Sequence, residues 1–166
     1  MSAPPRLPAG RAGELIASLG LAPHPEGGWF REVFRSTRRV TPHDGRRASR
    51  SALTHIDFLL AAGQASAWHR VCSDEAWQLL EGGPLRLWLM PPTLDAVSAT
   101  VLGGDAPPRH VVPADWWQAA EPLSEFAYVG ATVGPGFEFA DFDFMRVHPA
   151  PCAAMHRLDP SLARLL

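Results

Sequence analysis

The chain contains no lysine, so all fifteen of its basic side chains are arginines, set against seventeen acidic residues. Without a lysine amine, a mechanism that forms a Schiff base on a lysine side chain is excluded. The formal net charge of −2 gives no general attraction to nucleic acids or to anionic membranes. We therefore expect a small-molecule partner, with no nucleic acid and no membrane.

Cysteines and long apolar runs are also scarce. Cys72 and Cys152 are too few for a disulfide scaffold, and we expect free thiols in a reducing compartment. No apolar run approaches the roughly 20 residues of a membrane-spanning helix. The first ten residues lack the apolar segment of a secretory signal. These absences predict a cytoplasmic protein.

Glycine and proline are abundant, at 14 and 17 residues, which favours many turns and short strands. Residues 1–10 read as a flexible arm, and residues 11–166 are long enough for a single domain with a closed barrel. Roughly ten strands and no βαβ rhythm predict an all-β fold, an antiparallel jelly-roll barrel. Short helices are expected near the two ends, at 14–19 and 161–166, whereas the proline-rich stretch from His148 to Asp159 predicts no element.

The most informative stretch is 63–82, where apolar and polar residues alternate between glycines, a pattern typical of strand, turn and strand. Side chains two apart share a face of a strand, so His69 lies with Val71, and Glu75 lies with Trp77. If both faces point into a barrel, His69 and Glu75 meet at its mouth.

This spacing resembles the first motif of the cupin superfamily, with Gly63, His69, Glu75 and Gly82 at matching positions and Val71 in place of the second histidine. The segment 113–118 resembles the second cupin motif loosely, with Asp115 in place of a glycine and Gln118 in place of a histidine. The segments 23–32, 67–71 and 133–137 resemble a single-domain cupin subfamily of unassigned function, related in fold to germins, auxin-binding proteins and deoxysugar epimerases. The resemblance covers about residues 14–145 and implies a jelly roll that forms a homodimer.

Cupin metal sites use three histidines and a glutamate, whereas the matching positions here offer His69, Glu75 and the weak amide ligand Gln118. We expect no cofactor and no tightly bound catalytic metal, and at most a weakly held divalent ion on these three residues.

Further candidates would line an aromatic pocket. Trp29, Trp68 and Trp77 supply bulk for ligand contact or simply for the core, and Gln118 would orient a ligand. A carboxylate on a strand face between two phenylalanines is costly to bury, so Glu32 is either a ligand-binding residue or a solvated edge residue.

Charged residues on two strands leave alternatives open. His55 and Asp57 share a strand face and either point into the pocket or satisfy each other at the surface. Arg31 and Arg35 share one face of the predicted strand 29–36, opposite Glu32, and either of them would hold an anionic group of a ligand. The seven arginines between 31 and 50 either capture an anion or belong to a solvated loop.

Two functions fit these residues. The first is binding of a carbohydrate-like or small acidic or apolar metabolite without catalysis. The second is a metal-independent isomerase or epimerase for a sugar or sugar-nucleotide-like substrate, with His69 as general base and Glu75 adjusting it.

Overall fold

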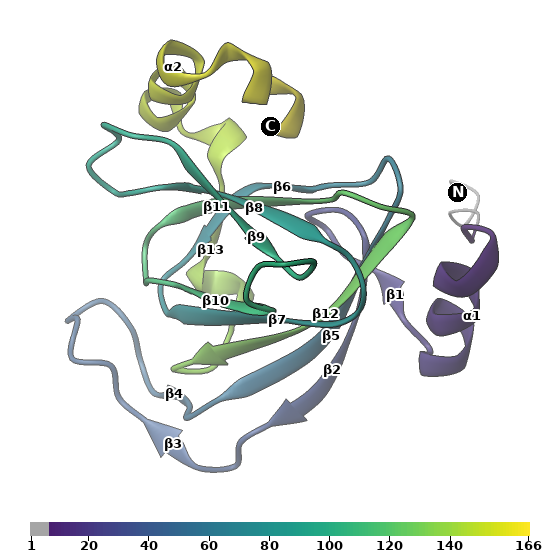
Figure 1. Ribbon diagram of the computed structural model, residues 1–166. Helices are drawn as coiled ribbons and strands as arrows, with labels where there is room; N and C mark the ends of the chain where they lie inside the picture. Colours follow the sequence, from purple (N-terminus) through teal and green to yellow (C-terminus); the bar gives the residue numbers. More distant parts are fainter. Residues whose placement is uncertain (1–6) are drawn as a thin grey trace, which may run out of the picture.

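The computed structural model describes residues 7–166 as two antiparallel sheets that face each other and close into a barrel (Figure 1). One sheet has the strand order β1-β2-β5-β12-β7-β10 and the other the order β13-β6-β11-β8-β9, while β3 pairs with β4 outside both. The strands are β1 (Ala22–Pro23), β2 (Trp29–Arg35), β3 (Arg39–Val40), β4 (Arg50–Ser51), β5 (Thr54–Ala61), β6 (Ser66–Val71), β7 (Asp74–Gly82), β8 (Leu85–Met90), β9 (Ser98–Leu102), β10 (Arg109–Val112), β11 (Trp117–Pro122), β12 (Phe126–Gly134) and β13 (Phe142–Phe144). The predicted jelly roll is confirmed.

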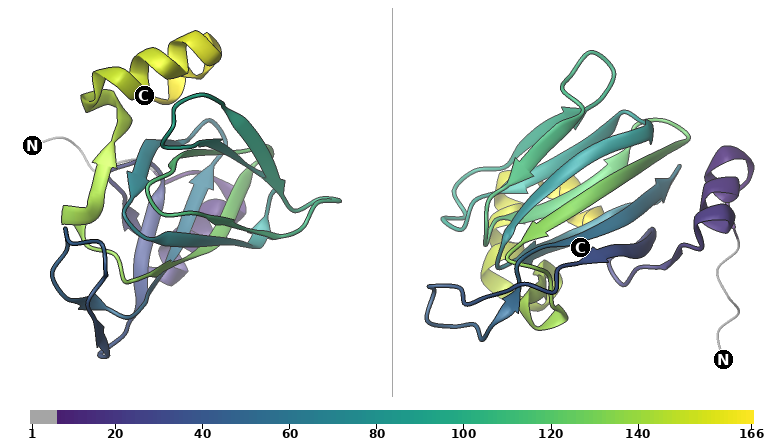
Figure 2. Two further views of the ribbon diagram at one scale, coloured as in Figure 1. Left: turned by 90° about the vertical axis from the view of Figure 1, so that its left-hand side faces the viewer. Right: turned by 90° about the horizontal axis from the view of Figure 1, so that it is seen from below.

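Helices cover the barrel from outside, as the two further views in Figure 2 show. The helices are α1 (Gly10–Leu19) and α2 (Pro149–Leu158), with short 3-10 segments η1 (Phe139–Asp141), η2 (Met145–Val147) and η3 (Pro160–Leu165). Within residues 7–166, none of these helices combines the length and apolarity needed to cross a bilayer.

The core is divided into three clusters. Between the sheets, Phe58, Leu87 and Val129 belong to the main cluster. Outside the six-stranded sheet, α1 packs over Trp29 and its neighbours. Outside the five-stranded sheet, α2 and η3 pack over the tryptophans of β6 and β11. One end of the barrel interior remains open for a cavity.

The helix α2 is the main error of the sequence-based prediction. Its prolines, Pro149 and Pro151, occupy the first turn, where the backbone N–H groups have no helical partner and proline costs little. The stretch was predicted to be irregular because its prolines were interpreted as breaks. In contrast, the predicted end of α1 is confirmed, since Gly20 closes that helix with a φ of 66°.

The arm predicted for residues 1–10 falls largely on residues 1–6, which lie outside the described part of the chain, and α1 already begins at Gly10. Both cysteines are free thiols.

Candidate functional site

A cavity of about 100 Å³ lies between the two sheets at one end of the barrel. Its lining is mostly apolar and aromatic, with a group of titratable residues at the inner end and a second group at the rim. The apolar lining residues are Phe30, Ile56, Phe58, Val71, Trp77, Ala131, Val133, Phe137, Phe139 and Phe142, and the polar ones are His24, Glu26, Glu32, Arg35, Thr54, His69, Glu75 and Glu138.

The turn from His24 to Gly28 places Glu26 in the cavity. Its backbone closes on itself, since the Gly27 N–H donates to the His24 carbonyl at 3.0 Å, and the Ala67 N–H donates to the Glu26 carbonyl at 2.8 Å. Gly27 has a φ of 109°, and a Cβ there would lie 2.1 Å from the Ala65 carbonyl oxygen. Glycine is therefore required for the turn to lie against the chain that leads into β6.

His69 has both ring nitrogens engaged. Nδ1 lies 2.8 Å from the Ala67 carbonyl oxygen, which can only accept, so Nδ1 carries a proton. Nε2 lies 3.3 Å from Oε2 of Glu26, and the ring stacks on Phe142 with centroids 5.2 Å apart. The Ser66 hydroxyl donates to the other oxygen of Glu26 at 2.9 Å. A neutral His69 accepting from a protonated Glu26 satisfies all of these contacts.

Glu75 is held by a chain of directed hydrogen bonds. The Trp77 indole N–H donates to Oε1 of Gln118 at 3.0 Å, which turns the Gln118 amide nitrogen toward Glu75. That nitrogen donates to Oε2 of Glu75 at 2.5 Å. Among residues 7–166, Gln118 is the only residue that hydrogen-bonds Glu75, so Oε1 of Glu75 has no partner there. Gln118 therefore positions Glu75 from behind the cavity wall.

Burial shifts the pKa values at the inner end toward neutral side chains. Burial raises the pKa of Glu26 to about 8, opposed by the Ser66 hydrogen bond. Burial raises the pKa of Glu75 to about 7, with His69 opposing and Glu26 adding to the rise. Burial together with His69 lowers the pKa of His24 to about 4, and burial also lowers the pKa of His69. Glu26 and Glu75 therefore titrate between about pH 7 and 8, and they lie beside the neutral imidazoles of His24 and His69.

The rim carries a salt-bridge cluster. Arg35 donates to both carboxylate oxygens of Glu32, at 2.9 and 2.8 Å, and to Glu138 at 3.0 Å. A bulge in β2 between Glu32 and Phe34 shifts the register against β5. The predicted alternation placed Arg35 on the face opposite Glu32, and the bulge corrects this by bringing both side chains to the rim.

The structure brings four of the predicted site residues to this cavity, namely His69, Glu75, Trp77 and Glu32, and it places Gln118 directly behind Glu75. The aromatic lining is otherwise phenylalanine, and not the tryptophans expected from the sequence. Trp29 is buried under α1, and Trp68 is buried under the C-terminal helices, so both are core residues outside the cavity.

Arg31 does not reach the cavity, which corrects its predicted ligand contact, and of the two alternatives for His55 and Asp57 the one outside the pocket holds, although each bonds another residue. These three side chains lie on the outer face of the six-stranded sheet, because Thr54, Ile56 and Phe58 take the inward positions of β5. Asp57 accepts from Arg31 at 2.7 Å and from Tyr128 at 2.9 Å. Arg31 also donates to the Leu19 carbonyl at 2.7 Å, which ties the end of α1 to the sheet. His55 contacts Thr132 at 2.7 Å.

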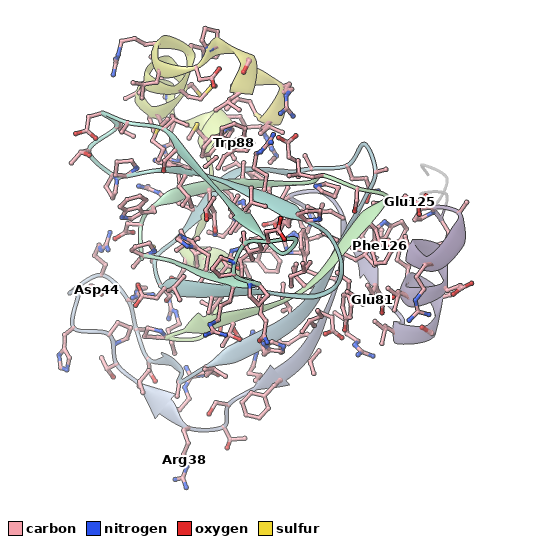
Figure 3. All side chains as sticks on the ribbon, viewed as in Figure 1. Arg38, Asp44, Glu81, Trp88, Glu125 and Phe126 are labelled. Atoms are coloured by element: carbon pink, nitrogen blue, oxygen red, sulfur yellow. The ribbon has the colours of Figure 1, made fainter. Side chains whose placement is uncertain are left out.

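Of the two alternatives for the arginines between 38 and 50, the structure supports a loop. Figure 3 shows Arg38 and Asp44 on a segment that projects from the barrel. Within it, Arg47 bonds Asp44 and Ser73, and Arg50 donates to both oxygens of Asp141 at 2.8 Å. These guanidinium groups are held by the chain itself.

His24 and Glu26 were not predicted as site residues. The segment containing them was noticed only for its family resemblance, and its two glycines indicate a turn but not its position against β6. The positive φ of 65° at Asp115, where the second cupin motif has glycine, supports the loose match of that motif.

The donor set does not fit the metal expected of a complete cupin site. Val71 offers no lone pair, the Gln118 carbonyl is bonded to Trp77, and Nε2 of His69 faces Glu26. Within residues 7–166, no group of three or more histidine, cysteine, aspartate or glutamate side chains is arranged to hold a metal.

Comparison with known proteins agrees with the fold. A hypothetical protein from Leishmania major is 28% identical with a TM-score of 0.75, covering 89% of this chain and 97% of that one. A protein from Shewanella oneidensis is 27% identical with a TM-score of 0.76, covering 95% and 98%. Oxalate decarboxylase from Bacillus subtilis, 17% identical with a TM-score of 0.55 and coverage of 86% and 36%, shares the fold alone. No curated protein matches the sequence. The family model described as cupin superfamily (DUF985) matches residues 13–145, and the chain belongs to that family.

Proposed function

We propose that this protein binds a small organic molecule in the barrel cavity. The observation that carries the proposal is an apolar, aromatic cavity with Glu26, His69 and Glu75 converging at its inner end. Small-molecule sites have this composition, in which apolar walls give affinity and a few polar groups fix orientation.

The cavity volume limits the size of the ligand. A cavity of about 100 Å³ is somewhat smaller than an engineered apolar cavity of about 150 Å³ that takes up benzene. A single ring or a short chain fits the enclosed part, whereas the nucleotide portion of a sugar nucleotide would remain outside it.

The charge of the lining argues against the small acidic ligand considered from the sequence. Among the described residues 7–166, Arg35 is the only arginine of the lining, and its guanidinium is bonded to Glu32 and Glu138. An anion in the cavity would meet two carboxyl groups and, from this part of the chain, no free cation. An apolar or carbohydrate-like molecule without a negative charge therefore fits better.

A filled-cavity variant tests the proposal. Ala131 lines the cavity, whereas its neighbour Thr132 points to the outer face of β12. We expect a panel of single-ring and short-chain probes, screened by saturation-transfer NMR, to bind the wild type and Thr132→Leu but not Ala131→Leu. Binding that survives Ala131→Leu, or a panel with no binder, would contradict a ligand site in this cavity.

A second function, proton transfer in an isomerase or epimerase, is favoured by one observation. Glu75 has an oxygen without a partner among the described residues and a pKa raised to about 7, which suits a general base near neutral pH. In that reaction Glu75 takes the role first given to His69, because both nitrogens of His69 are engaged.

Solvent deuterium tests this alternative. A bound carbonyl probe would exchange its α-proton in the wild type and lose the exchange in Glu75→Gln, while Glu81→Gln, on the outside of the barrel beside α1 (Figure 3), would retain it. Exchange at the wild-type rate in Glu75→Gln would contradict the role of Glu75. Binding without exchange in the wild type would contradict proton transfer and support ligand binding as the only function of the cavity.

A further inference from the structure

We propose that the ligand of this cavity is a small organic cation, a primary or quaternary ammonium compound. This inference rests on the proposed binding function and names the chemical class of its ligand. It follows from three features of the lining: the absence of a cation near two buried carboxyl groups among residues 7–166, an oxygen of Glu75 without a partner there, and the predominance of aromatic rings.

The first feature is electrostatic. Glu26 and Glu75 are only 9% and 7% exposed, yet no arginine within residues 7–166 contacts either of them, and this chain has no lysine. Buried carboxylates in proteins are normally paired with a cation. The two imidazoles at the inner end do not supply one, because burial lowers the pKa of each. Without such a partner among residues 7–166 the two groups favour their neutral forms, as the protonated Glu26 does beside His69, and a cationic ligand would supply the charge that stabilises their ionised forms.

The second feature is the direction of the unsatisfied polar group. Oε2 of Glu75 is bound by Gln118, which is itself fixed by the Trp77 indole, so the carboxyl group cannot turn away without breaking the hydrogen bond from Gln118. Its other oxygen has no partner in residues 7–166, and Glu75 is part of the cavity lining. An ammonium N–H, or the positive surface of a quaternary ammonium, would complement this oxygen.

Aromatic rings form much of the remaining wall. Phe137, Phe139 and Phe142 lie with ring centroids 5.1 to 6.4 Å apart, and Phe30, Phe58 and Trp77 come from the facing strands. Aromatic rings attract cations through their negative faces, and the attraction is larger where water is excluded. Among residues 7–166, the only guanidinium in the lining is that of Arg35, and Glu32 and Glu138 neutralise it at the rim. A cation in the cavity is therefore attracted by the aromatic rings of the walls and by the carboxyl groups at the inner end.

Three ligands of nearly equal shape and different charge test the inference: benzylammonium, benzyl alcohol and benzoate, measured by isothermal titration calorimetry at pH 7. We expect benzylammonium to bind at least about tenfold more tightly than benzyl alcohol, and benzoate to bind most weakly. Cation binding should also release protons, because it favours the ionised forms of Glu26 and Glu75, and this appears as a dependence of the heat on the buffer.

Isosteric variants locate the effect. Glu75→Gln should remove about a tenfold advantage of benzylammonium over benzyl alcohol, whereas Glu81→Gln, outside the barrel, should leave that ratio unchanged. If benzyl alcohol or benzoate bound as tightly as benzylammonium or more tightly, the proposal of a cationic ligand would be overturned, while the proposal that the cavity binds small molecules would stand. Binding of none of the three would also overturn the cation, whereas the filled-cavity variants decide separately whether the cavity binds ligands at all.

Discussion

Two groups of buried carboxylates in this protein have opposite surroundings. Asp141, 5% exposed, accepts two hydrogen bonds from Arg50 at 2.8 Å and has a nitrogen of Arg47 at 3.7 Å. Glu75, 7% exposed, has one neutral amide donor, and Glu26 has one hydroxyl and the imidazoles of His69 and His24, at 3.3 and 3.7 Å. Equal burial therefore comes with two guanidinium partners in one region and with none in the other.

The difference distinguishes Asp141, which belongs to a structural ion pair, from Glu26 and Glu75, which belong to a candidate binding site. Asp141 ties the loop before β5 to the segment before β13, and every charge in that cluster is explained by another charge in the chain. The carboxyl groups of the cavity impose a desolvation cost that no cation within residues 7–166 offsets. Such an uncompensated arrangement, in a cavity, is typical of functional sites.

The largest expected effect tests the structural side of this comparison. Asp141→Asn should lower the free energy of unfolding by about 3 kcal/mol, because it leaves the largely buried guanidinium of Arg50 without its carboxylate partner, whereas Arg47 keeps Asp44. Glu75→Gln, at equal burial, should change it by less than about 1 kcal/mol or raise it, since the amide keeps the shape and removes a charge that is costly to bury. Urea denaturation at pH 7 measures both. An equal loss in the two variants would show that Glu75 is also a structural residue.

The pH dependence of stability tests the cavity side. The folded-state pKa values of Glu26 and Glu75 are raised, so the folded protein holds more protons than the unfolded chain above pH 4.5, and stability falls as pH rises through 7 and 8. Between pH 6.5 and 8.5 we expect a loss of about 2 to 3 kcal/mol in the free energy of unfolding. The lowered pKa values of His24 and His69 affect stability only below pH 6.5, so the loss between pH 6.5 and 8.5 comes from the two glutamates.

Glu26→Gln sharpens the same measurement. The variant mimics the protonated side chain, so it should remove most of the fall in stability with pH and be more stable than the wild type at pH 8.5. Glu81→Gln, whose exposed carboxylate pairs with Arg11, should keep the wild-type slope. A slope unchanged by Glu26→Gln would mean that Glu26 is ionised throughout this range.

Sequence reasoning reached the fold because the alternation around His69 and Glu75 and the flanking glycines are local signals. It placed these two side chains together because strand parity fixes the face of a residue as long as the strand is regular. It failed at Arg35, where a bulge reverses the parity, and at Glu26, which reaches the cavity only because a turn docks on a distant strand. It also failed for Trp68, because the burial partner of that residue is α2, a helix hidden by its prolines.

A smaller effect is expected behind the cavity wall. Gln118→Leu removes the donor to Glu75 and the acceptor of the Trp77 N–H, so it should cost about 1 to 2 kcal/mol of stability. It should also raise the pKa of Glu75 further, because the amide favours the ionised carboxylate. Carbon-13 NMR of the carboxyl group measures this pKa. Gln78→Leu, on the exposed face of the same strand as Glu75, is the control and should leave it unchanged.

The smallest expected effect lies on the outer face of the six-stranded sheet. His55 belongs to β5, whose Ile56 and Phe58 line the cavity, but its ring lies over Gly130 on the other side of the sheet and contacts Thr132. His55→Ala should therefore leave the affinity for any cavity ligand within about twofold and cost less than about 1 kcal/mol, the loss of one partly exposed hydrogen bond. Titration of the probes used for Glu75→Gln measures the affinity. A large loss of affinity in His55→Ala would mean that the ligand contacts the outer face, and the contrast between the two sides of the sheet would no longer hold.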